Sequence, residues 1–378
     1  MSYRKLPQPM IGMILVLLLL AGCSAPASTP VLTGQAGFFK FIRTIQVTPD
    51  SNFLTGSFAR INYVPASDRF VVTFGTKLST QPGNCQGAGY AYKEYTTDMQ
   101  ETGKSGSLIL YSDACEAGDS ASVMVDNTYY LVSIPQVPGY PHGWRLIKFD
   151  AVSWATLAET IVSLKAPNEG ELDPCVAYAN GQLDVSDQYN PSGIWQEGAA
   201  SHHHFFSTAL QPLGDEKILT DTPHISGSSM IYVDGVYYII TANDYAGDLV
   251  VVKYDQQWKY LGVKKLIKQA NWSQGVVFDG QRFYVSYLDT SQRTEPGFSP
   301  VYLNVHLAAF DRNWNLLEDV AVTNYAPSDY KQPGRPWVIL HGNRLYVSYD
   351  MDTVDPVTHE EQKKWQAYVS IYELTQGP

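Results

Sequence analysis

A pattern of alternating apolar and polar residues recurs six times along the chain. Each copy is an alternating run, a short turn and a second alternating run that is rich in aromatic residues. Four copies have an Asx-Gly or Gly-Asn turn, and an Asx-Gly pair between alternating runs is the strongest short-range signal for a β-hairpin. The six copies are 59–74, 122–134, 175–187, 229–241, 275–287 and 337–349. We therefore expect six similar units of antiparallel strands.

A second motif follows the hairpin in three of the copies. An alternating run ends in an aromatic residue and Asp, and Trp follows after two or three further residues, at 146–154, 250–258 and 307–314. Another alternating stretch comes next, so each unit should contain four strands. The Asp and Trp of this motif are best interpreted as turn and packing residues. Successive hairpin turns lie roughly 45 to 62 residues apart, which is typical of propeller blades of the kelch or WD type with long loops.

The two ends of the repeat array complement each other. The last unit has a third strand over 365–374 but no fourth, while 38–47 has a strand pattern and no hairpin partner nearby. Pairing these two segments would close a ring and cover both sheet edges. The prediction is an all-β domain over 38–378: a six-bladed β-propeller with four antiparallel strands per blade, closed by the N-terminal strand. A seven-bladed or five-bladed ring and two separate β domains are the alternatives.

The N-terminal segment has the pattern of a secretion signal. Arg4 and Lys5 precede an apolar run over 11–20, which is shorter than the roughly 20 residues that span a membrane. The following Leu-Ala-Gly-Cys23 resembles the lipobox of bacterial lipoproteins, and this resemblance implies cleavage before Cys23 and lipidation of its thiol. We expect a signal peptide over 1–22, and the lipidated Cys23 with a flexible tether over 23–37. An ordinary secretion signal with an incidental cysteine is the alternative.

The location that follows is extracytoplasmic, with a lipid anchor in the bacterial cell membrane. By analogy with bacterial lipoproteins, Ser24 in place of Asp after the cysteine implies the outer membrane in a bacterium that has one. Three further cysteines remain, and outside the cytosol a disulfide can form. We expect a bridge between Cys85 and Cys115, because both fall in long loops of blades that are neighbours in the ring. Cys175 begins an innermost strand and should be a buried thiol.

Charge limits the partners. The chain has 26 Lys and Arg against 37 Asp and Glu, a net charge of −11. Such a protein has no general basic field with which to hold nucleic acid. The expected partners are the membrane, through the lipid on Cys23, and a glycan or a protein of the cell envelope.

Loop lengths predict which face of the propeller carries the functional site. The hairpin turns are short, whereas the other connections are long, and all the long ones fall on one face. Residues just before the first strands surround the channel on that face. Their aromatic rings and planar polar groups suit sugar rings. The predicted ligand-binding residues are Arg60, His224, Trp272, Gln274, Arg335 and Trp337. Packing of the two tryptophans between blades is the alternative for those residues.

Two windows, 171–185 and 229–244, resemble the propeller glycoside hydrolases of the furanosidase class, the arabinanases and β-xylosidases. The resemblance lies in an Asp-Pro before an apolar strand with an Asx-Gly turn, and in a Gly-x-Tyr-Tyr hairpin. It implies hydrolysis of a glycosidic bond by two carboxylates, for which Asp119 and Asp173 are the candidates. The chain departs from that class at 226–228, where Ser-Gly-Ser replaces the family's acid, and the family has five blades. The Ser-x-Asp-x-Gly-x-x-Trp boxes of the six-bladed sialidases are absent from the sequence.

Metal-binding patterns are sparse. His202 and His204 would share one face of a strand and could together hold a metal ion, with His224 as a third ligand. The alternative is a polar start of a strand, stacked on Phe205 and Tyr189. Oxygen-rich segments at 113–119 and 350–355 leave calcium open, and no cofactor is otherwise expected.

The function that we expect from the sequence is binding of a ligand, a glycan foremost, on the long-loop face of a membrane-tethered propeller. A glycoside hydrolase with paired carboxylates at the channel mouth is the enzymatic alternative. A scaffold for proteins of the cell envelope is the third. The sequence favours a binding protein over an enzyme.

Overall fold

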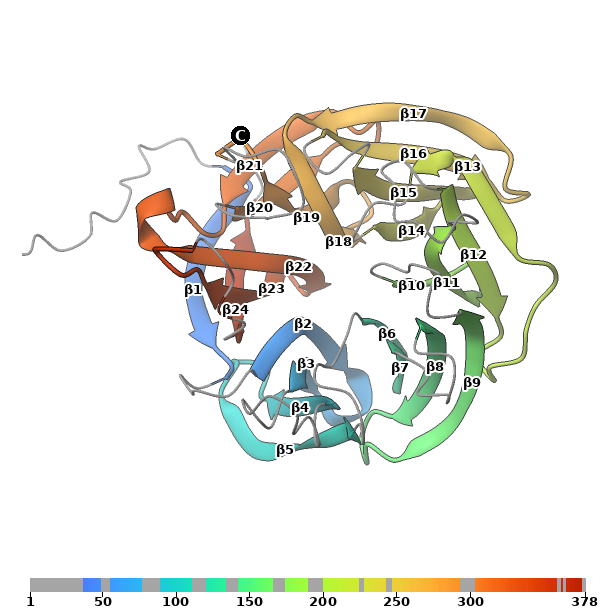
Figure 1. Ribbon diagram of the computed structural model, residues 1–378, viewed down its shortest axis with the longest axis horizontal. Helices are drawn as coiled ribbons and strands as arrows, with labels where there is room; N and C mark the ends of the chain where they lie inside the picture. The colour runs from blue at the N-terminus through green and yellow to red at the C-terminus, as the bar shows by residue number, and fades with distance from the viewer. Residues whose placement is uncertain are drawn as a thin grey trace, which may run out of the picture. The chain divides into compact units, whose positions relative to one another are not determined.

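The computed structural model describes residues 37–48, 55–76, 89–110, 120–133, 142–165, 174–189, 200–223, 228–242, 247–292, 303–358, 362 and 365–375. These residues form six four-stranded antiparallel sheets around a central axis, with no α-helix in any of the described ranges (Figure 1). The described part of the chain therefore contains no helix that could cross a membrane. The predicted six-bladed propeller is confirmed.

The blades follow one another in chain order. Blade 1 consists of β2 (Thr55–Val64), β3 (Arg69–Thr76), β4 (Gly89–Tyr95) and β5 (Glu101–Leu110). Blade 2 consists of β6 (Ala121–Val125), β7 (Thr128–Ser133), β8 (His142–Asp150) and β9 (Thr156–Lys165). Blade 3 consists of β10 (Cys175–Ala179), β11 (Gln182–Tyr189), β12 (Ala200–Phe206) and β13 (Lys217–Pro223). Blade 4 consists of β14 (Ser229–Val233), β15 (Val236–Ala242), β16 (Leu249–Asp255) and β17 (Tyr260–Ile267). Blade 5 consists of β18 (Ala270–Phe278), β19 (Phe283–Asp289), β20 (Asn304–Phe310) and β21 (Leu316–Ala321). The first strand of each blade lies innermost (Figure 1).

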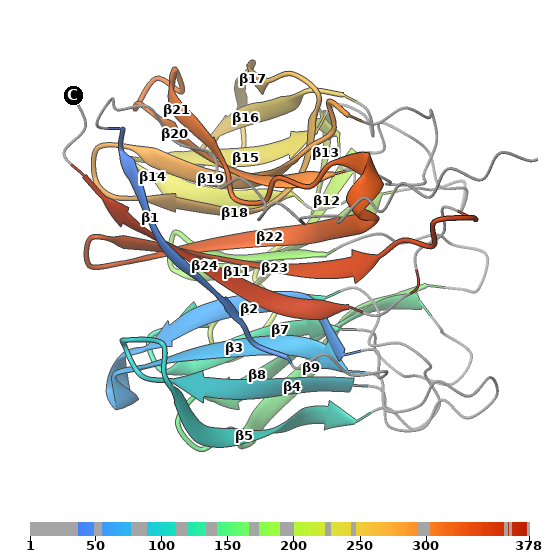
Figure 2. The same cartoon turned by 90° about the vertical axis from the view of Figure 1, so that its left-hand side faces the viewer.

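Blade 6 is built from both ends of the chain. It contains β22 (Lys331–His341), β23 (Arg344–Thr353) and β24 (Gln366–Leu374), and its fourth strand is β1 (Phe39–Gln46). β1 runs antiparallel beside β24, with Phe39 opposite Leu374 and Gln46 opposite Tyr368 (Figure 2). The closure predicted from the unpaired N-terminal strand is thus correct.

Apolar side chains fill each of the six interfaces between neighbouring blades. Six clusters of buried residues lie at these interfaces, one at each. The aromatic-Asp-Trp motif supplies part of three of them. Its tryptophans have left-handed backbones and stack on a ring from another strand: Trp154 on Tyr92, Trp258 on Tyr237 and Trp314 on Phe283. The motif therefore serves as turn and packing, as predicted.

A buried hydroxyl lies in the second strand of every blade, at the same position in blades 1, 3, 5 and 6 and one residue later in blades 2 and 4. The six residues are Thr73, Ser133, Ser186, Thr241, Ser286 and Ser348. Two of them show what the position does. Ser348 donates to the carbonyl oxygen of Ala59 and accepts from the N–H of Ile61, while the hydroxyl of Thr73 lies 2.7 Å from that of Tyr129. These contacts join one blade to the next.

Candidate functional site

Three neighbouring blades share a distortion at the start of the innermost strand. The pairing register shifts in β2 between Ser57 and Arg60, in β18 between Asn271 and Gly275, and in β22 between Gly334 and Trp337. One residue in each bulge has a left-handed backbone: Phe58 at φ 52°, Trp272 at φ 45° and Arg335 at φ 47°. Bulky residues rarely adopt this conformation, which persists where the surroundings hold it in place. The bulges turn a large planar side chain out of the strand's ordinary alternation.

The guanidinium of Arg335 is held on three sides. Its carbon lies 4.2 Å from the centre of the Phe58 ring and 4.5 Å from that of Trp365, and one nitrogen is 3.2 Å from the Asp350 carboxylate. Asp350 is fully buried and also accepts the N–H of Phe58 at 2.7 Å. The arrangement joins blade 6 to blade 1 and fixes a cation–π stack beside the innermost strands of these blades.

The other predicted binding residues of this region are largely packed. Arg60 is 2% exposed, donates to the carbonyl oxygen of Arg335 at 3.1 Å and lies 5.4 Å from the Trp337 ring centre. Trp337 is half-buried and donates to the carbonyl oxygen of Ile61, and Trp272 is half-buried against the cluster between blades 5 and 6. Gln274 lies in the bulge of β18. Ligand binding by these residues stays a prediction.

Several predicted residues lie outside the described part of the chain. They are the candidate catalytic pair Asp119 and Asp173, His224, the lipidation site Cys23, and Cys85 with Cys115 of the predicted disulfide. Their assignments stay predictions. Cys175 is described and is a buried free thiol, as predicted. Burial raises the pKa of this thiol to about 12, so that it does not act as a nucleophile near neutral pH.

Histidines 202, 203 and 204 alternate across β12. The His203 Nδ1 donates to the carboxylate of Asp184, at 2.9 and 3.1 Å from its two oxygens. The His203 Nε2 lies 2.9 Å from the Ser201 hydroxyl. Both His203 and Asp184 are buried, and Trp258 of blade 4 covers the imidazole. This histidine is therefore part of the packing between blades 3 and 4.

The opposite face of β12 brings His202 and His204 together with Asp187 of β11. The three residues each offer one ligand atom, and these atoms lie within 4.8 Å of one another. Asp187 faces His202 directly across the strand pair, and its Oδ1 is 3.4 Å from the His202 Nδ1. Glu216, just before β13, places Oε2 3.0 Å from the His202 Nε2 and 3.4 Å from the His204 Nδ1. Sequence reasoning paired the two histidines but missed both acids.

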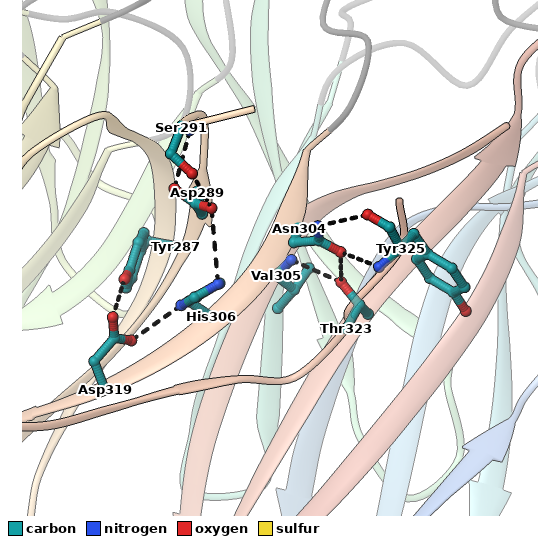
Figure 3. A network of polar contacts seen from close by, with 9 residues as sticks. All are labelled: Tyr287, Asp289, Ser291, Asn304, Val305, His306, Asp319, Thr323 and Tyr325. Carbon is teal, nitrogen blue, oxygen red and sulfur yellow. Dashed lines mark hydrogen bonds and ion pairs between the residues drawn. The ribbon is translucent and has the colours of Figure 1, made fainter. Parts of the chain in front are cut away.

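Blade 5 has a histidine at the position of His202. In blade 3, Asp187 follows Ser186 and faces His202 on the next strand. In blade 5, Tyr287 follows Ser286 and faces His306 on the next strand. The His306 Nδ1 lies 3.2 Å from Asp319, and the Tyr287 hydroxyl donates to the same carboxylate at 2.8 Å (Figure 3). Burial, and then the Asp319 charge, raise the pKa of Tyr287 above its ordinary value.

The same view of blade 5 shows a second network on β20. The side-chain oxygen of Asn304 accepts from the Thr323 hydroxyl and from the N–H of Tyr325, and its nitrogen donates to the Tyr325 carbonyl (Figure 3). Thr323 in turn accepts the N–H of Val305. This network ties the chain after β21 to the blade and has a structural role.

Comparison with known proteins identifies a solved structure that shares the fold. No family model matches the sequence, and no curated protein matches it. The endosialidase of phage phi92 is 10% identical over 92% of this chain and 72% of its own, with a TM-score of 0.57. At this identity the likeness shows a shared fold. Other similar structures include an α-L-arabinofuranosidase of Clostridium thermocellum, 13% identical over 71% of this chain and 94% of its own, with a TM-score of 0.45.

A GH43 protein of Bacteroides ovatus is also similar. It is 11% identical over 69% of this chain and 57% of its own, with a TM-score of 0.45. The chain thus spans little more than half the length of that protein.

Proposed function

We propose that the mouth of the channel over blades 5, 6 and 1 binds a carbohydrate. We use "mouth" for Phe58, Trp272, Arg335, Trp337 and Trp365. The observation that supports the proposal is the bulge repeated in three adjacent innermost strands, each with a planar side chain on a left-handed residue. A non-glycine residue in this conformation costs about 1–2 kcal/mol. Such distortions gather at binding sites, where they aim a side chain that a regular strand would direct elsewhere.

The chemistry of the mouth fits sugar rings. Trp272, Trp337 and Trp365 are each half-buried, so that one part of the indole is held and another part is accessible. Sugars present apolar ring faces to such rings and hydroxyl edges to planar polar groups. The Arg335 guanidinium is already fixed by Phe58, Trp365 and Asp350, so that little side-chain freedom remains to be lost on binding.

A binding assay tests the proposal. The purified full chain is titrated with neutral plant and bacterial polysaccharides and with a sialic acid polymer, which is included because the phage phi92 endosialidase shares the fold. We expect one class of glycan to bind, and Trp272→Ala or Trp365→Ala to weaken that binding about tenfold or more. Tyr260→Ala, an exposed aromatic on β17 away from the mouth, is the matched control and should bind as the unaltered chain does. Equal binding by all three variants, or no binding to any glycan, would exclude the mouth as a carbohydrate site.

The same mixtures decide whether binding leads to hydrolysis. Released oligosaccharides that disappear in both Asp119→Asn and Asp173→Asn would make the protein a glycoside hydrolase with those carboxylates as acid and base or nucleophile. Binding without release would leave a glycan-binding propeller.

We also propose that a lipid on Cys23 tethers the propeller to the membrane outside the cytoplasm. The support is the sequence alone, in the lipobox-like Leu-Ala-Gly-Cys23 after a short apolar run. Metabolic labelling with a fatty acid tests it: label in the unaltered chain and none in Cys23→Ala is the expected result. Unlabelled protein in the soluble fraction would favour an ordinary secretion signal.

A further inference from the structure

We infer that Asp187, His202 and His204 bind a divalent transition-metal ion, with Glu216 as the outer carboxylate that orients the two imidazoles. The site lies in blade 3, on the face of β11 and β12 that turns towards blade 2, where Val185 and Phe206 pack. It is separate from the carbohydrate mouth proposed above, which belongs to blades 5, 6 and 1.

The spacing of the donor atoms suits one small ion. Ligands that lie about 2.0–2.2 Å from a tetrahedral zinc ion are about 3.3–3.5 Å from each other. The His202 Nδ1 and the Asp187 Oδ1 are 3.4 Å apart, and a nitrogen of His204 lies within 4.8 Å of both. The two imidazole centres are 4.1 Å apart. Binding would draw the third donor to coordination distance through a change in the His204 side-chain torsions.

The second nitrogen of each imidazole is directed to a single acid. Glu216 Oε2 lies 3.0 Å from the His202 Nε2 and 3.4 Å from the His204 Nδ1, so an ion would be ligated through the His202 Nδ1 and the His204 Nε2. Metal-bound histidines nearly always donate their other N–H to a carboxylate, a carbonyl or water, and this bond sets the tautomer. Glu216 is 60% exposed, so it lies on the solvent side of the site.

Burial and charge point to a cation. Asp187 is 0% exposed, and both histidine side chains are 11% exposed. A carboxylate buried to this extent is stabilised when a positive ion is bound beside it. Neutral imidazole is a ligand for metal ions, and ligation by two imidazoles and one carboxylate keeps both rings uncharged.

The donor set selects the class of metal. Two nitrogens and one carboxylate oxygen are the ligands of zinc sites with an open fourth position, and the same set holds other divalent ions such as Fe²⁺. Calcium takes six to eight oxygen ligands, so a site with two imidazoles does not suit it. The fourth position is then available to water or to an oxygen of a bound ligand.

Blade 5 provides a matched comparison within the same molecule. His306 stands where blade 3 has His202, and Asp319 stands where blade 3 has Glu216. Ala308 replaces His204, and Tyr287 replaces Asp187. Only one imidazole remains, and the Tyr287 hydroxyl donates to Asp319. Removal of His306 should therefore leave metal binding unchanged.

The experiment measures metal binding directly. The purified full chain is stripped with a chelator and titrated with Co²⁺, whose visible absorption reports its coordination, and then with Zn²⁺ in competition. We expect one ion per chain with the absorption of a four- or five-coordinate site. His202→Ala and His204→Ala should each weaken binding at least a hundredfold, Glu216→Gln about ten- to a hundredfold, and His306→Gln not at all. No binding by the unaltered chain, or equal loss in His306→Gln, would overturn the inference.

A second measurement guards against a variant that fails to fold. In the presence of chelator, the thermal unfolding of His204→Ala should match that of the unaltered chain. Zn²⁺ should raise the unfolding temperature of the unaltered chain and of His306→Gln, because it binds the folded state, and should leave that of His204→Ala where it was. A zinc-dependent rise that persists in His204→Ala would place the ion elsewhere.

Discussion

Blades 3 and 5 have the same backbone and a histidine at the same point of the third strand, but they surround it differently. His202 of blade 3 has Asp187 across the strand pair and His204 two residues on. His306 of blade 5 has Tyr287 across the pair and Ala308 two residues on. In blade 5 the polar groups satisfy one another, whereas in blade 3 they converge on one point. The propeller framework decides where side chains meet, and two positions decide whether they form a closed network or a set of ligands.

The opposite faces of these strands differ as well. Blade 3 buries the pair of His203 and Asp184, and blade 5 has Leu307 and Tyr284 at the corresponding positions. A buried pair of hydrogen-bonded polar side chains is often no more stabilising than an apolar pair of similar volume, although the loss of one partner is costly. The difference between the blades therefore predicts an asymmetry between single and double substitutions.

The largest effect should follow from His203→Leu. This change leaves the buried carboxylate of Asp184 without its imidazole partner, and we expect a loss of about 3–5 kcal/mol in the free energy of unfolding. The double variant Asp184→Leu/His203→Leu, which places two apolar side chains at these positions of blade 3, should recover most of the loss. Urea-induced unfolding at neutral pH measures both. A double variant as unstable as the single one would show that the pair itself stabilises the blade.

A smaller effect, with a pH dependence, should follow from Tyr287→Phe. At pH 7–9 the lost hydrogen bond to Asp319 should cost about 1 kcal/mol. The pKa of Tyr287 is higher in the folded protein than the value near 10 of an unfolded chain, so its contribution is complete below about pH 10 and is lost as the pH rises further. The unaltered chain loses about 1.4 kcal/mol per pH unit through this group, so the two proteins should be equally stable near pH 11. Urea unfolding at pH 8 and pH 11 tests this, and a difference that stays constant would contradict it.

The smallest effect should follow from Glu216→Ala in the presence of chelator. The Glu216 side chain is largely exposed, and exposed ion pairs contribute little, so we expect a loss below about 0.5 kcal/mol. Asp319→Ala in blade 5 should cost about 1–2 kcal/mol, because it removes the acceptor of a buried hydroxyl. Thermal unfolding of the two variants side by side provides the comparison. Equal losses would mean that Glu216 has a structural role like that of Asp319.

The sequence was sufficient for the fold because its signals are local. The turn at Asn180 and Gly181 sets the pairing of β10 with β11, in which Ala179 faces Gln182. The pairing of β11 with β12 is different, because residues 190–199 lie between the two strands and no short turn sets their register. Two histidines on one strand face follow from alternation alone, but the approach of Asp187 and Glu216 depends on this longer-range pairing.

The sequence predicted the place of the mouth, at the start of the innermost strands, but not the backbone conformation of its residues. Phe58, Trp272 and Arg335 are residue types that rarely adopt a left-handed backbone, so nothing in their identity predicts the bulges. The hydroxyl of Thr73, Ser186, Ser286 and Ser348 occupies the same position in four of the repeats. Its meaning appears only when adjacent blades are placed side by side, because its partners lie in the next blade.

The pairing of β1 with β24 has a consequence for the order of assembly. Of the described strands β1 is made first during synthesis, and its hydrogen-bonding partner β24 is made last. Contacts so distant in sequence form slowly, because most of the chain must be closed into a loop before the two strands can pair. Blades 1 to 5 consist of consecutive strands and can associate as they emerge, whereas blade 6 must wait for the final segment. In the nascent chain β1 thus stays without its partner until β24 has been made, and completion of the ring is the step at which that exposed edge disappears.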